Sequence, residues 1–548
     1  MSSTAKKLGG IIILCVGLKL FIDSQFIKQI AGTLLKTNQA SATVQTNILS
    51  NSLATPASSS QPTSYQNYDV VIYGDEVPGV CAAIWAKKGL GPKGKVALVR
   101  SNHPGDFLGG VLTRGGLAYV DLDKIPAWYS EPYAQCFVNF LDKANVLEAC
   151  LEAKTADRAL REMLAEAGVK VISSSTLTPY VANQKIEYVE VKDSNLRIQA
   201  NSYIDATQDA ELARKAGLAY YQGYESQNSK LRNDTLSVSI IPTIIGLSIS
   251  DLRNIESDIF YNQRLMDKIQ RSIKKSQDRL GAEFWLKHFG SPIYQPYPDG
   301  YMLRSVALGA AYHLAHNQPF TQDGFFFDRA NVCIHKDESL SWNGFLFKYP
   351  VDKILELEAT GRKPTPEMVQ EMSSIQAWLQ KISRKDVRLL LPEEIYIRQS
   401  VNIRDVVDPL TGEEIIKGGT EPEKSIGSFS YDFDLRGGVK GLSLKIPPLP
   451  IYNFGIENAL ATKVNNLGIV GRSSGYVGLA VSVGRILTVN IYQGQGVGVA
   501  AAIAHRSQVP LNQITSKQVR ETLENLTGKF TRLYGRDTTY GENYSQVK

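Results

Sequence analysis

Residues 68–88 read YDVVIYGDEVPGVCAAIWAKK, and this stretch decides the fold. A short apolar run from Asp69 to Tyr73 leads into a turn from Gly74 to Gly79, and a helix-compatible run follows from Val80 to Lys88. A second apolar run, VALVR, ends at Arg100. Short apolar runs on either side of a helix are typical of buried parallel strands. The pattern therefore predicts a strand–helix–strand unit whose glycine turn could hold a dinucleotide.

The turn has the residues that a pyrophosphate needs, with two departures from the general G-x-G-x-x-G pattern. Gly74 and Gly79 let the backbone approach phosphate, and the following helix presents free N–H groups at its positive end. Glu76 stands at the middle glycine position, and Arg100 ends the second strand where Asp or Glu usually binds a ribose hydroxyl. Asp75 and Pro78 complete the turn.

Three later blocks follow in order. They are FLGGVLTRGG from Phe107, YIDATQDAELA from Tyr203, and NNLGIVGR ending at Arg472, which is followed by Arg485 and by GQGVG from Gly494. Together with the first turn, this order resembles the FAD-dependent oxidoreductase family, which has the glutathione-reductase-like FAD/NAD(P)-binding Rossmann fold. In that family the position of Glu76 is often not glycine, whereas Gln208 replaces a glycine of the family's pattern.

The resemblance implies FAD as cofactor and a set of residues that contact it. These residues are Gly74, Asp75, Glu76, Pro78, Gly79, Arg100, Gly109, Gly110, Thr113, Asp205, Thr207, Gly471, Arg472, Gly494, Gln495 and Gly498. It also implies that a helix begins at the GQGVG block and points its N–H groups at the flavin.

The expected activity is hydride transfer between flavin and an unidentified small molecule, with an unknown electron acceptor. No catalytic acid or base stands out, and Arg472 and Arg485 are the only weak candidates. One alternative is an NADP-binding enzyme, since Arg100 at the end of the second strand could bind a 2′-phosphate. NADP alone would not explain the C-terminal block that runs from Gly471 to Gly498. Another is a non-catalytic, membrane-tethered scaffold with a degenerate flavoprotein fold, which Glu76, Arg100 and Gln208 motivate.

The expected fold is α/β, with a discontinuous FAD-binding Rossmann-like domain and an inserted mixed α+β substrate domain. The FAD-binding parts are residues 68–215 and 440–507, and the substrate domain is 216–439. Residues 37–67 are polar and uncharged, which is typical of a flexible linker. The sequence of residues 508–548 predicts a short helix followed by a polar tail.

The first 36 residues form a separate segment, in which Lys6 and Lys7 precede an uncharged run from Leu8 to Leu18. The run is too short to span a bilayer comfortably and lacks a nearby small-residue cleavage site. An uncleaved membrane anchor, a cleaved signal and a surface helix all remain open. We expect association with a membrane through the N-terminus on an undetermined side, with an exported body as the alternative. Because no twin-arginine signal is present, a cytoplasm-facing body is a further option.

Composition excludes other classes. The chain of 548 residues has 43% hydrophobic residues and a net charge of +6, an ordinary globular balance and too little charge for a nucleic-acid binder. The five cysteines form no C-x-x-C pair and no Cys/His ligand spacing, so neither a disulfide framework nor a metal site is expected. Cys81, in the first helix, is expected to pack as a small apolar residue.

Overall fold

The computed structural model describes residues 64–536, apart from 102, 104, 193, 289–294, 298–299, 303–305, 330, 437 and 439–449. It shows a mixed α/β body, and the described residues belong to one compact unit. The predicted N-terminal anchor or signal and most of the predicted linker lie outside the described residues. Within the described part of the chain, no helix has both the length and the apolar character needed to cross a membrane.

The main sheet is built around β1, and its strand order is β3-β2-β1-β6-β5-β4, with β21 paired to the end of β6. Its strands are β1 (Ser64–Tyr73), β2 (Val96–Val99), β3 (Lys170–Ile172), β4 (Leu177–Ala182), β5 (Lys185–Val191), β6 (Leu196–Asp205) and β21 (Leu467–Ile469). β1, β2, β3, β6 and β21 are parallel, whereas β5 runs antiparallel to β4 and β6. The sheet therefore takes strands from both predicted halves of the nucleotide-binding domain.

The linker was predicted to end at residue 67 and the folded body to begin at Tyr68, but β1 already begins at Ser64. Residues 64–67 pair with residues 196–199 of β6, so the first part of the strand is held by main-chain hydrogen bonds although its side chains are exposed. The alternation that marks a half-buried strand is absent there, which explains why the sequence pattern missed it.

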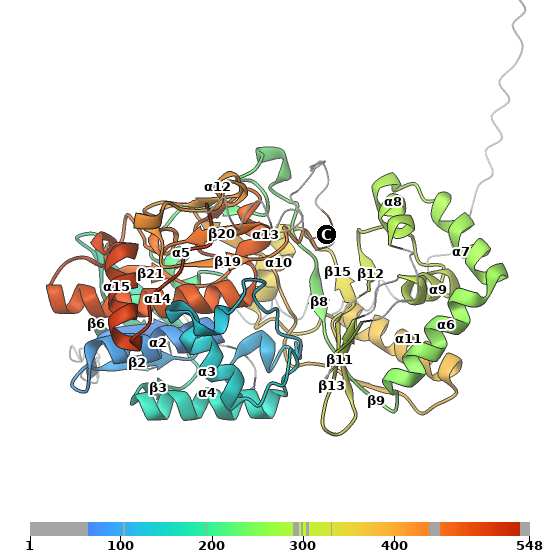
Figure 1. Cartoon of the computed structure of the whole chain (residues 1–548), viewed down its shortest axis with the longest axis horizontal. Coiled ribbons are helices and arrows are strands. Elements are labelled where there is room, and N and C mark those ends of the chain that lie inside the picture. Colours follow the sequence, from blue (N-terminus) through green and yellow to red (C-terminus); the bar gives the residue numbers. More distant parts are fainter. Residues whose placement is uncertain are drawn as a thin grey trace, which may run out of the picture. The chain divides into compact units, whose positions relative to one another are not determined.

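Two helices that are far apart in the sequence, α2 (Val77–Leu90) and α14 (Leu487–Ser507), pack side by side in the core, as Figure 1 shows. Further helices surround them: α3 (Gln135–Lys143), α4 (Ala153–Ala167) and α15 (Ser516–Thr527). Almost every residue of α2 and α14 is buried, and the polar faces that mark amphipathic helices are missing.

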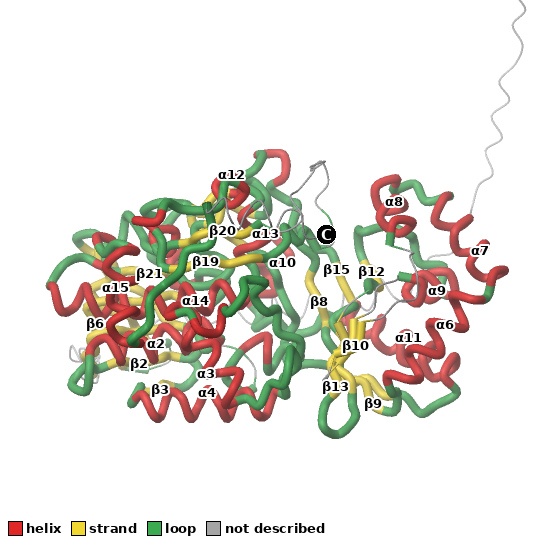
Figure 2. Tube along the Cα trace, viewed as in Figure 1, coloured by secondary structure: helices red, strands yellow, loops and turns green. Residues whose placement is uncertain are grey.

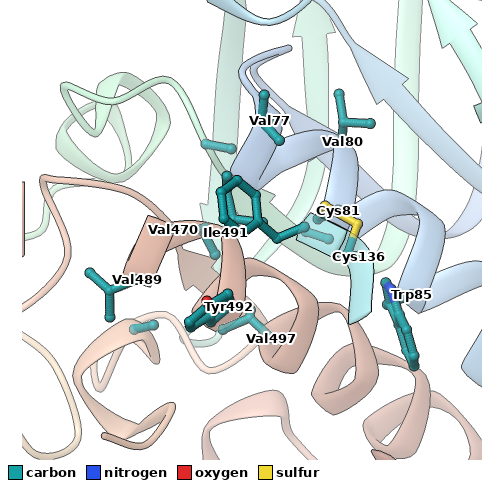
Figure 3. Packing of buried hydrophobic residues seen from close by; sticks show 14 of the residues in the cluster. Val77, Val80, Cys81, Trp85, Cys136, Val470, Val489, Ile491, Tyr492 and Val497 are labelled. Carbon is teal, nitrogen blue, oxygen red and sulfur yellow. A yellow bond between two sulfur atoms is a disulfide. The ribbon is translucent and has the colours of Figure 1, made fainter. Parts of the chain in front are cut away.

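Two disulfides overturn the expectation drawn from cysteine spacing. Cys81 of α2 is bonded to Cys136 of α3, close to the buried Trp85 and Tyr492 (Figure 3). Cys150 is bonded to Cys333, 183 positions away. Cys81 is thus a cross-link and not merely a small apolar residue. The partners are too far apart in sequence for spacing to reveal them.

A second core forms between residues 238 and 397, apart from the core of the main sheet. Figure 2 shows its helices gathered beside short strands. Its helices are α6 (Ile249–Tyr261), α7 (Gln263–Lys274), α8 (Arg279–Lys287), α9 (Ala307–Ala315) and α11 (Pro366–Ser383). One antiparallel sheet has the order β10-β11-β13-β14-β9-β16 and another the order β12-β15-β8. These strands are β8 (Val238–Ile240), β9 (Thr243–Ile245), β10 (Gln295–Tyr297), β11 (Gly300–Met302), β12 (Phe325–Phe327), β13 (Asn331–Ile334), β14 (Leu340–Trp342), β15 (Phe345–Phe347) and β16 (Arg388–Leu390).

The remaining elements are short. They are α5 (Glu211–Lys215), β7 (Tyr220–Gln222), α10 (Val351–Ala359), β17 (Val401–Ile403), β18 (Leu410–Thr411), α12 (Gly412–Ile416), β19 (Gly427–Ser430), β20 (Ile451–Phe454), β22 (Tyr476–Val477) and α13 (Ala480–Gly484). The domain boundaries at residues 215, 439 and 507 stay predictions.

Candidate functional site

Four segments that are distant in sequence meet where the parallel strands end. β1 ends at Tyr73, β2 at Val99, β6 at Asp205 and β21 at Ile469, and all four point the same way. The glycine turn, Arg100, Thr207 and Arg472 directly follow these strands. In open α/β sheets, ligands bind in the crevice outside the carboxyl ends of the strands. We call this place the sheet-end crevice.

The glycine turn requires its two glycines. Gly74 has φ +119°, and a Cβ atom there would lie 2.2 Å from the carbonyl oxygen of Ala206. A Cβ atom at Gly79 would lie 2.4 Å from the carbonyl oxygen of Gly74. Pro78 lies in the first turn of α2, and no side chain caps the N-terminus of that helix. The backbone thus has the tight strand-to-helix geometry that dinucleotide-binding turns share.

The carboxylate of Asp75 is held by two arginines. Nε of Arg100 lies 2.9 Å from its Oδ2 atom, and Nη1 of Arg114 lies 3.0 Å from the same atom. Arg100 also donates hydrogen bonds to the carbonyl oxygens of Gly105 and Phe107. Arg100, predicted to contact the cofactor, is thus engaged with the chain itself.

The side chain of Glu76 covers the second glycine turn. Gly109 and Gly110 have φ angles of +102° and +57°, and a Cβ atom at Gly110 would lie 2.1 Å from Cγ of Glu76. Thr113 closes this turn by donating to the carbonyl oxygen of Leu108 at 2.6 Å. The two glycine turns therefore face each other, and Glu76 fills the space between them.

A buried chain of charges runs from Glu76 through Arg362 and Glu358 to Arg472. Nη1 of Arg362 lies 3.0 Å from Oε1 of Glu76, and its Nε atom is paired with Glu358. Glu358 lies 3.4 Å from Nη2 of Arg472. We call these four residues the crevice ion-pair chain. Arg362 comes from the region of the second core, and its Nη2 atom also donates to the carbonyl oxygen of Thr207 at 2.7 Å.

Burial dominates the electrostatics of this chain. Burial raises the pKa of Glu76, and the nearby guanidinium groups of Arg472 and Arg362 partly offset that effect. Burial likewise raises the pKa of Glu358. Oε2 of Glu76 and Nε of Arg472 are buried, and neither atom has a hydrogen-bond partner among the residues that the structure describes. Polar groups buried in this way carry a desolvation cost that a further ligand atom or water would relieve.

Side chains of the protein also occupy the space at the carboxyl end of β6. Oδ1 of Asp205 accepts hydrogen bonds from the backbone and hydroxyl of Thr207, and burial raises the pKa of Asp205 to about 6. A Cβ atom at Gly471 would lie 2.5 Å from Oε1 of Gln208. Gln208 thus fills the position where the family has glycine, directly against Gly471.

The GQGVG block does not begin a helix, contrary to the expectation from the sequence. α14 begins at Leu487, so Gly494, Gln495 and Gly498 lie in its interior. A Cβ atom at Gly494 would lie 2.4 Å from the carbonyl oxygen of Pro78, and one at Gly498 would lie 2.2 Å from that of Ala82. These glycines let α14 approach α2. The side chain of Gln495 bonds to the backbone of Pro132 and Cys136.

Arg485 lies in a different cluster from Arg472. Its guanidinium group is paired with Asp434 and donates to the hydroxyl of Tyr396 at 3.3 Å. Of the two candidate arginines, only Arg472 belongs to the crevice ion-pair chain. The sequence reading did not single out Arg114, Glu358 or Arg362. Arg114 stands in LTRGG, and Glu358 and Arg362 stand in LELEATGRKP, and neither context marks these residues as parts of a site. Among the described residues, no group of His, Cys, Asp and Glu is arranged to hold a metal ion.

The glycine turn at the end of a parallel strand and the crevice beside it define the class of dinucleotide-binding α/β proteins. The model of the family "FAD dependent oxidoreductase" matches residues 69–523. The chain belongs to this family, and FAD is the cofactor that this membership assigns to it. No curated protein matches the chain.

Solved structures of flavin enzymes are distantly similar. The OxyS anhydrotetracycline hydroxylase from Streptomyces rimosus is 10% identical with a TM-score of 0.38, and the match covers 84% of this chain and 65% of the hydroxylase. The flavin-dependent brominase Bmp2 is 10% identical with a TM-score of 0.37, covering 84% of each chain. The halogenase PltM is 12% identical with a TM-score of 0.36, covering 84% of this chain and 73% of the halogenase.

The backbone of the sheet-end crevice suits FAD, but the arrangement of its side chains does not. Glu76 lies over Gly110 and Gln208 lies against Gly471, so both glycine cradles are filled. A cavity beside Thr113 and Arg114 has a volume of about 180 Å³, whereas ligand clefts usually span ~300–1,000 Å³. FAD therefore fits only after Glu76, Gln208 and Arg362 have moved.

Proposed function

We propose that this protein is an FAD-dependent oxidoreductase that transfers hydride between flavin and a small molecule. The observation that carries the proposal is the convergence of four distant segments on the carboxyl ends of β1, β2, β6 and β21. When it is bound, FAD supplies the hydride chemistry. The chain supplies the glycine turns and the N-terminus of α2, whose N–H groups are suited to phosphate.

Loading of the cofactor then requires the crevice ion-pair chain to open. Arg362 is the central residue, because it bridges Glu76 and Glu358 and bonds to the backbone of Thr207. Release of Glu76 from Arg362 uncovers Gly109 and Gly110. The same release frees a guanidinium group, which binds phosphate well in proteins.

A second candidate function is favoured by the same side chains. If the crevice ion-pair chain never opens, the protein keeps the fold without bound FAD and has a non-catalytic role. Glu76, Gln208 and Arg362 support this alternative because together they fill the place between the glycine turns.

FAD binding to the full chain separates the two candidates. The wild-type protein is titrated with FAD, and binding is followed by quenching of flavin fluorescence and by the visible absorption of the dialysed protein. The proposed enzyme binds FAD, and the variant Glu76→Ser binds it more tightly because the space above Gly110 is vacated. The matched control is Glu162→Ser, whose side chain is about half exposed on α4.

The outcomes are distinct. Wild-type protein that stays colourless and does not quench added FAD refutes the proposed function and supports the non-catalytic alternative. If only Glu76→Ser binds FAD, then Glu76 is the residue that blocks the cofactor. Unchanged affinity in Glu76→Ser refutes the assignment of the crevice between the two glycine turns as the binding place.

We also propose that the body of the protein faces an oxidising compartment, which favours the exported alternative. Four of the five cysteines form disulfides, and such bonds persist in oxidising compartments and are rare in the cytosol. Protease treatment of intact cells or sealed vesicles tests this. A body that is protected together with cytosolic proteins, and whose four thiols are reduced, contradicts it.

A further inference from the structure

Arg398 is a buried guanidinium group that has no carboxylate partner among the described residues. It is 2% exposed. Nη1 donates to the carbonyl oxygen of Ser237 at 2.7 Å, and Nη2 donates to Oδ1 of Asn343 at 3.2 Å. Its Nε atom is buried and has no hydrogen-bond partner in the part of the chain that the structure describes. A buried cation that is left without an anion is costly, so this position calls for a negative group.

Two buried hydroxyls in the segments that flank Arg398, those of Ser239 and Ser400, have no hydrogen-bond partner among the described residues. Ser239 and Tyr396 form an antiparallel bridge, with both N–H···O bonds at 2.9 Å, so their side chains share one face. The guanidinium group of Arg398 lies 4.4 Å from the centre of the Tyr396 ring. Ser239 and Ser400 are fully buried, and Ser400 is two positions from Arg398 in the chain.

The neighbouring carboxylates pair directly with other arginines, so Arg398 is compensated only at a distance, by Asp434. Asp434 is paired with Arg485 and lies 3.7 Å from Nε of Arg436, while Asp328 is paired with Arg436. Burial lowers the pKa of Arg398 to about 10. The positive charges of Arg485 and Arg436 act in the same direction, whereas Tyr396 and the charge of Asp434 act in the opposite direction. Both carboxylates of the cluster are thus committed to other arginines.

The cluster lies where the main body meets the second core. Arg485 comes from the segment between α13 and α14, whereas Ser239 belongs to β8 and Asn343 follows β14. Ligand pockets form preferentially at such junctions. Asn343 is partly exposed, and the side chains of Asp434 and Arg436 are about one quarter exposed, so the cluster reaches solvent on one side.

We propose that Arg398 binds a carboxylate group of the small-molecule substrate, with the hydroxyl of Ser239 as a second donor. This inference deepens the proposed function, on which it rests for the existence of a substrate. The Nε atom and the adjoining Nη atom of a guanidinium group form a fork that matches the two oxygens of a carboxylate. A neutral amide of the same shape provides one acceptor only, and it has no charge to balance the arginine.

The test uses benzoate and acetate as carboxylate probes, with benzamide and acetamide as their neutral counterparts. Affinity for the full-length protein is measured by the shift in melting temperature and by isothermal titration, without added FAD. The wild-type protein is expected to bind the carboxylates and not the amides. Arg398→Met removes the charge while it keeps the apolar bulk, and it is expected to weaken binding by about tenfold or more. Ser239→Ala should weaken binding less.

Arg404→Met is the matched control, because Arg404 is exposed and its guanidinium group lies 6.0 Å from the ring of Tyr221, outside the cluster. It should bind the probes as the wild type does. The proposal is overturned if the wild type does not discriminate carboxylate from amide, or if Arg398→Met binds as well as the wild type. FAD binding measured on the same samples keeps the two proposals apart. Carboxylate binding without FAD binding refutes the flavin enzyme alone, whereas FAD binding without carboxylate selectivity refutes the Arg398 site alone.

Discussion

Nη1 of Arg362 lies 3.0 Å from Oε1 of Glu76, although the two residues are 286 positions apart in the chain. Their pairing connects the first glycine turn to the region that carries the second core. Both side chains are almost fully buried. The pair is therefore a structural contact between two distant parts of the body as well as an obstacle in the sheet-end crevice.

Arg362→Ala should lower the free energy of unfolding strongly. The substitution leaves the carboxylates of Glu76 and Glu358 buried without their shared arginine, and breaking a buried ion pair in this way costs about 3–5 kcal/mol. Urea unfolding followed by circular dichroism measures the loss.

A compensated variant provides the control for this prediction. Arg362→Met combined with Glu76→Gln removes one positive and one negative charge and keeps the Glu358–Arg472 pair, so it should be markedly more stable than Arg362→Ala. A loss of less than about 1 kcal/mol for Arg362→Ala, the range of exposed ion pairs, would show that the buried pairing is not formed in solution.

Two glycines of α14 should respond differently to alanine. At Gly498 a Cβ atom would lie 2.2 Å from the backbone oxygen of Ala82, whereas at Gly496 the nearest atom is the flexible end of Ile426, at 2.6 Å. Overpacking against backbone costs about 1–3 kcal/mol, and alanine returns up to about 1 kcal/mol of helix propensity. Gly498→Ala should therefore be clearly destabilised and Gly496→Ala nearly neutral in thermal unfolding. Equal effects would contradict the close packing of α14 on α2.

Removal of the Cys81–Cys136 disulfide should lower the stability. The bond closes a loop with a sequence separation of 55, for which the chain-entropy estimate is about 4 kcal/mol. Cys81→Ala combined with Cys136→Ala should lose about this much in urea unfolding without reductant. Cys15→Ser is the control, because Cys15 takes part in neither disulfide, and it should leave the stability unchanged. Four reactive thiols in the unreduced, denatured Cys15→Ser protein would contradict both bonds.

Glu256 should make stability depend on pH. This residue of α6 is 1% exposed, and neither carboxylate oxygen has a hydrogen-bond partner within the described ranges. Burial raises its pKa from 4.5 to about 7. Between these values the folded protein holds a proton that the unfolded chain has released, so the free energy of unfolding falls as the pH rises. The full effect of one such carboxyl is about 3 kcal/mol.

Comparison with Glu256→Gln isolates this effect from other titrating groups. The stability of Glu256→Gln relative to wild type should rise from about pH 4.5 to about pH 7 and level off above it. Glu283→Gln, on the neighbouring α8 and 60% exposed, should follow the wild type throughout. A difference between Glu256→Gln and wild type that is constant with pH would contradict the raised pKa.

The sequence was sufficient to predict those structural elements that are determined by residues adjacent to one another in the chain. The apolar run of β1, the glycine turn and the start of α2 follow one another directly, so the pattern was sufficient for the first unit and for the family. The turn glycines had to be glycine for a local reason, the approach of Gly74 to Ala206 and of Gly79 to Gly74.

Features that depend on distant partners could not be predicted. Glu76 was an evident departure, but the sequence does not say that Arg362 pairs with it. The family resemblance implied a helix start at the GQGVG block, whereas here close packing on Pro78 and Ala82 requires its glycines. The cysteine pairs were missed because their spacing has no local signature.

The bond between Cys150 and Cys333 has a consequence for how the protein can be cut. A protease that cleaves once anywhere between these two residues yields fragments that migrate together until a thiol reagent is added. The region of the second core up to β13 falls inside this covalent loop, so a nick there leaves the molecule in one piece.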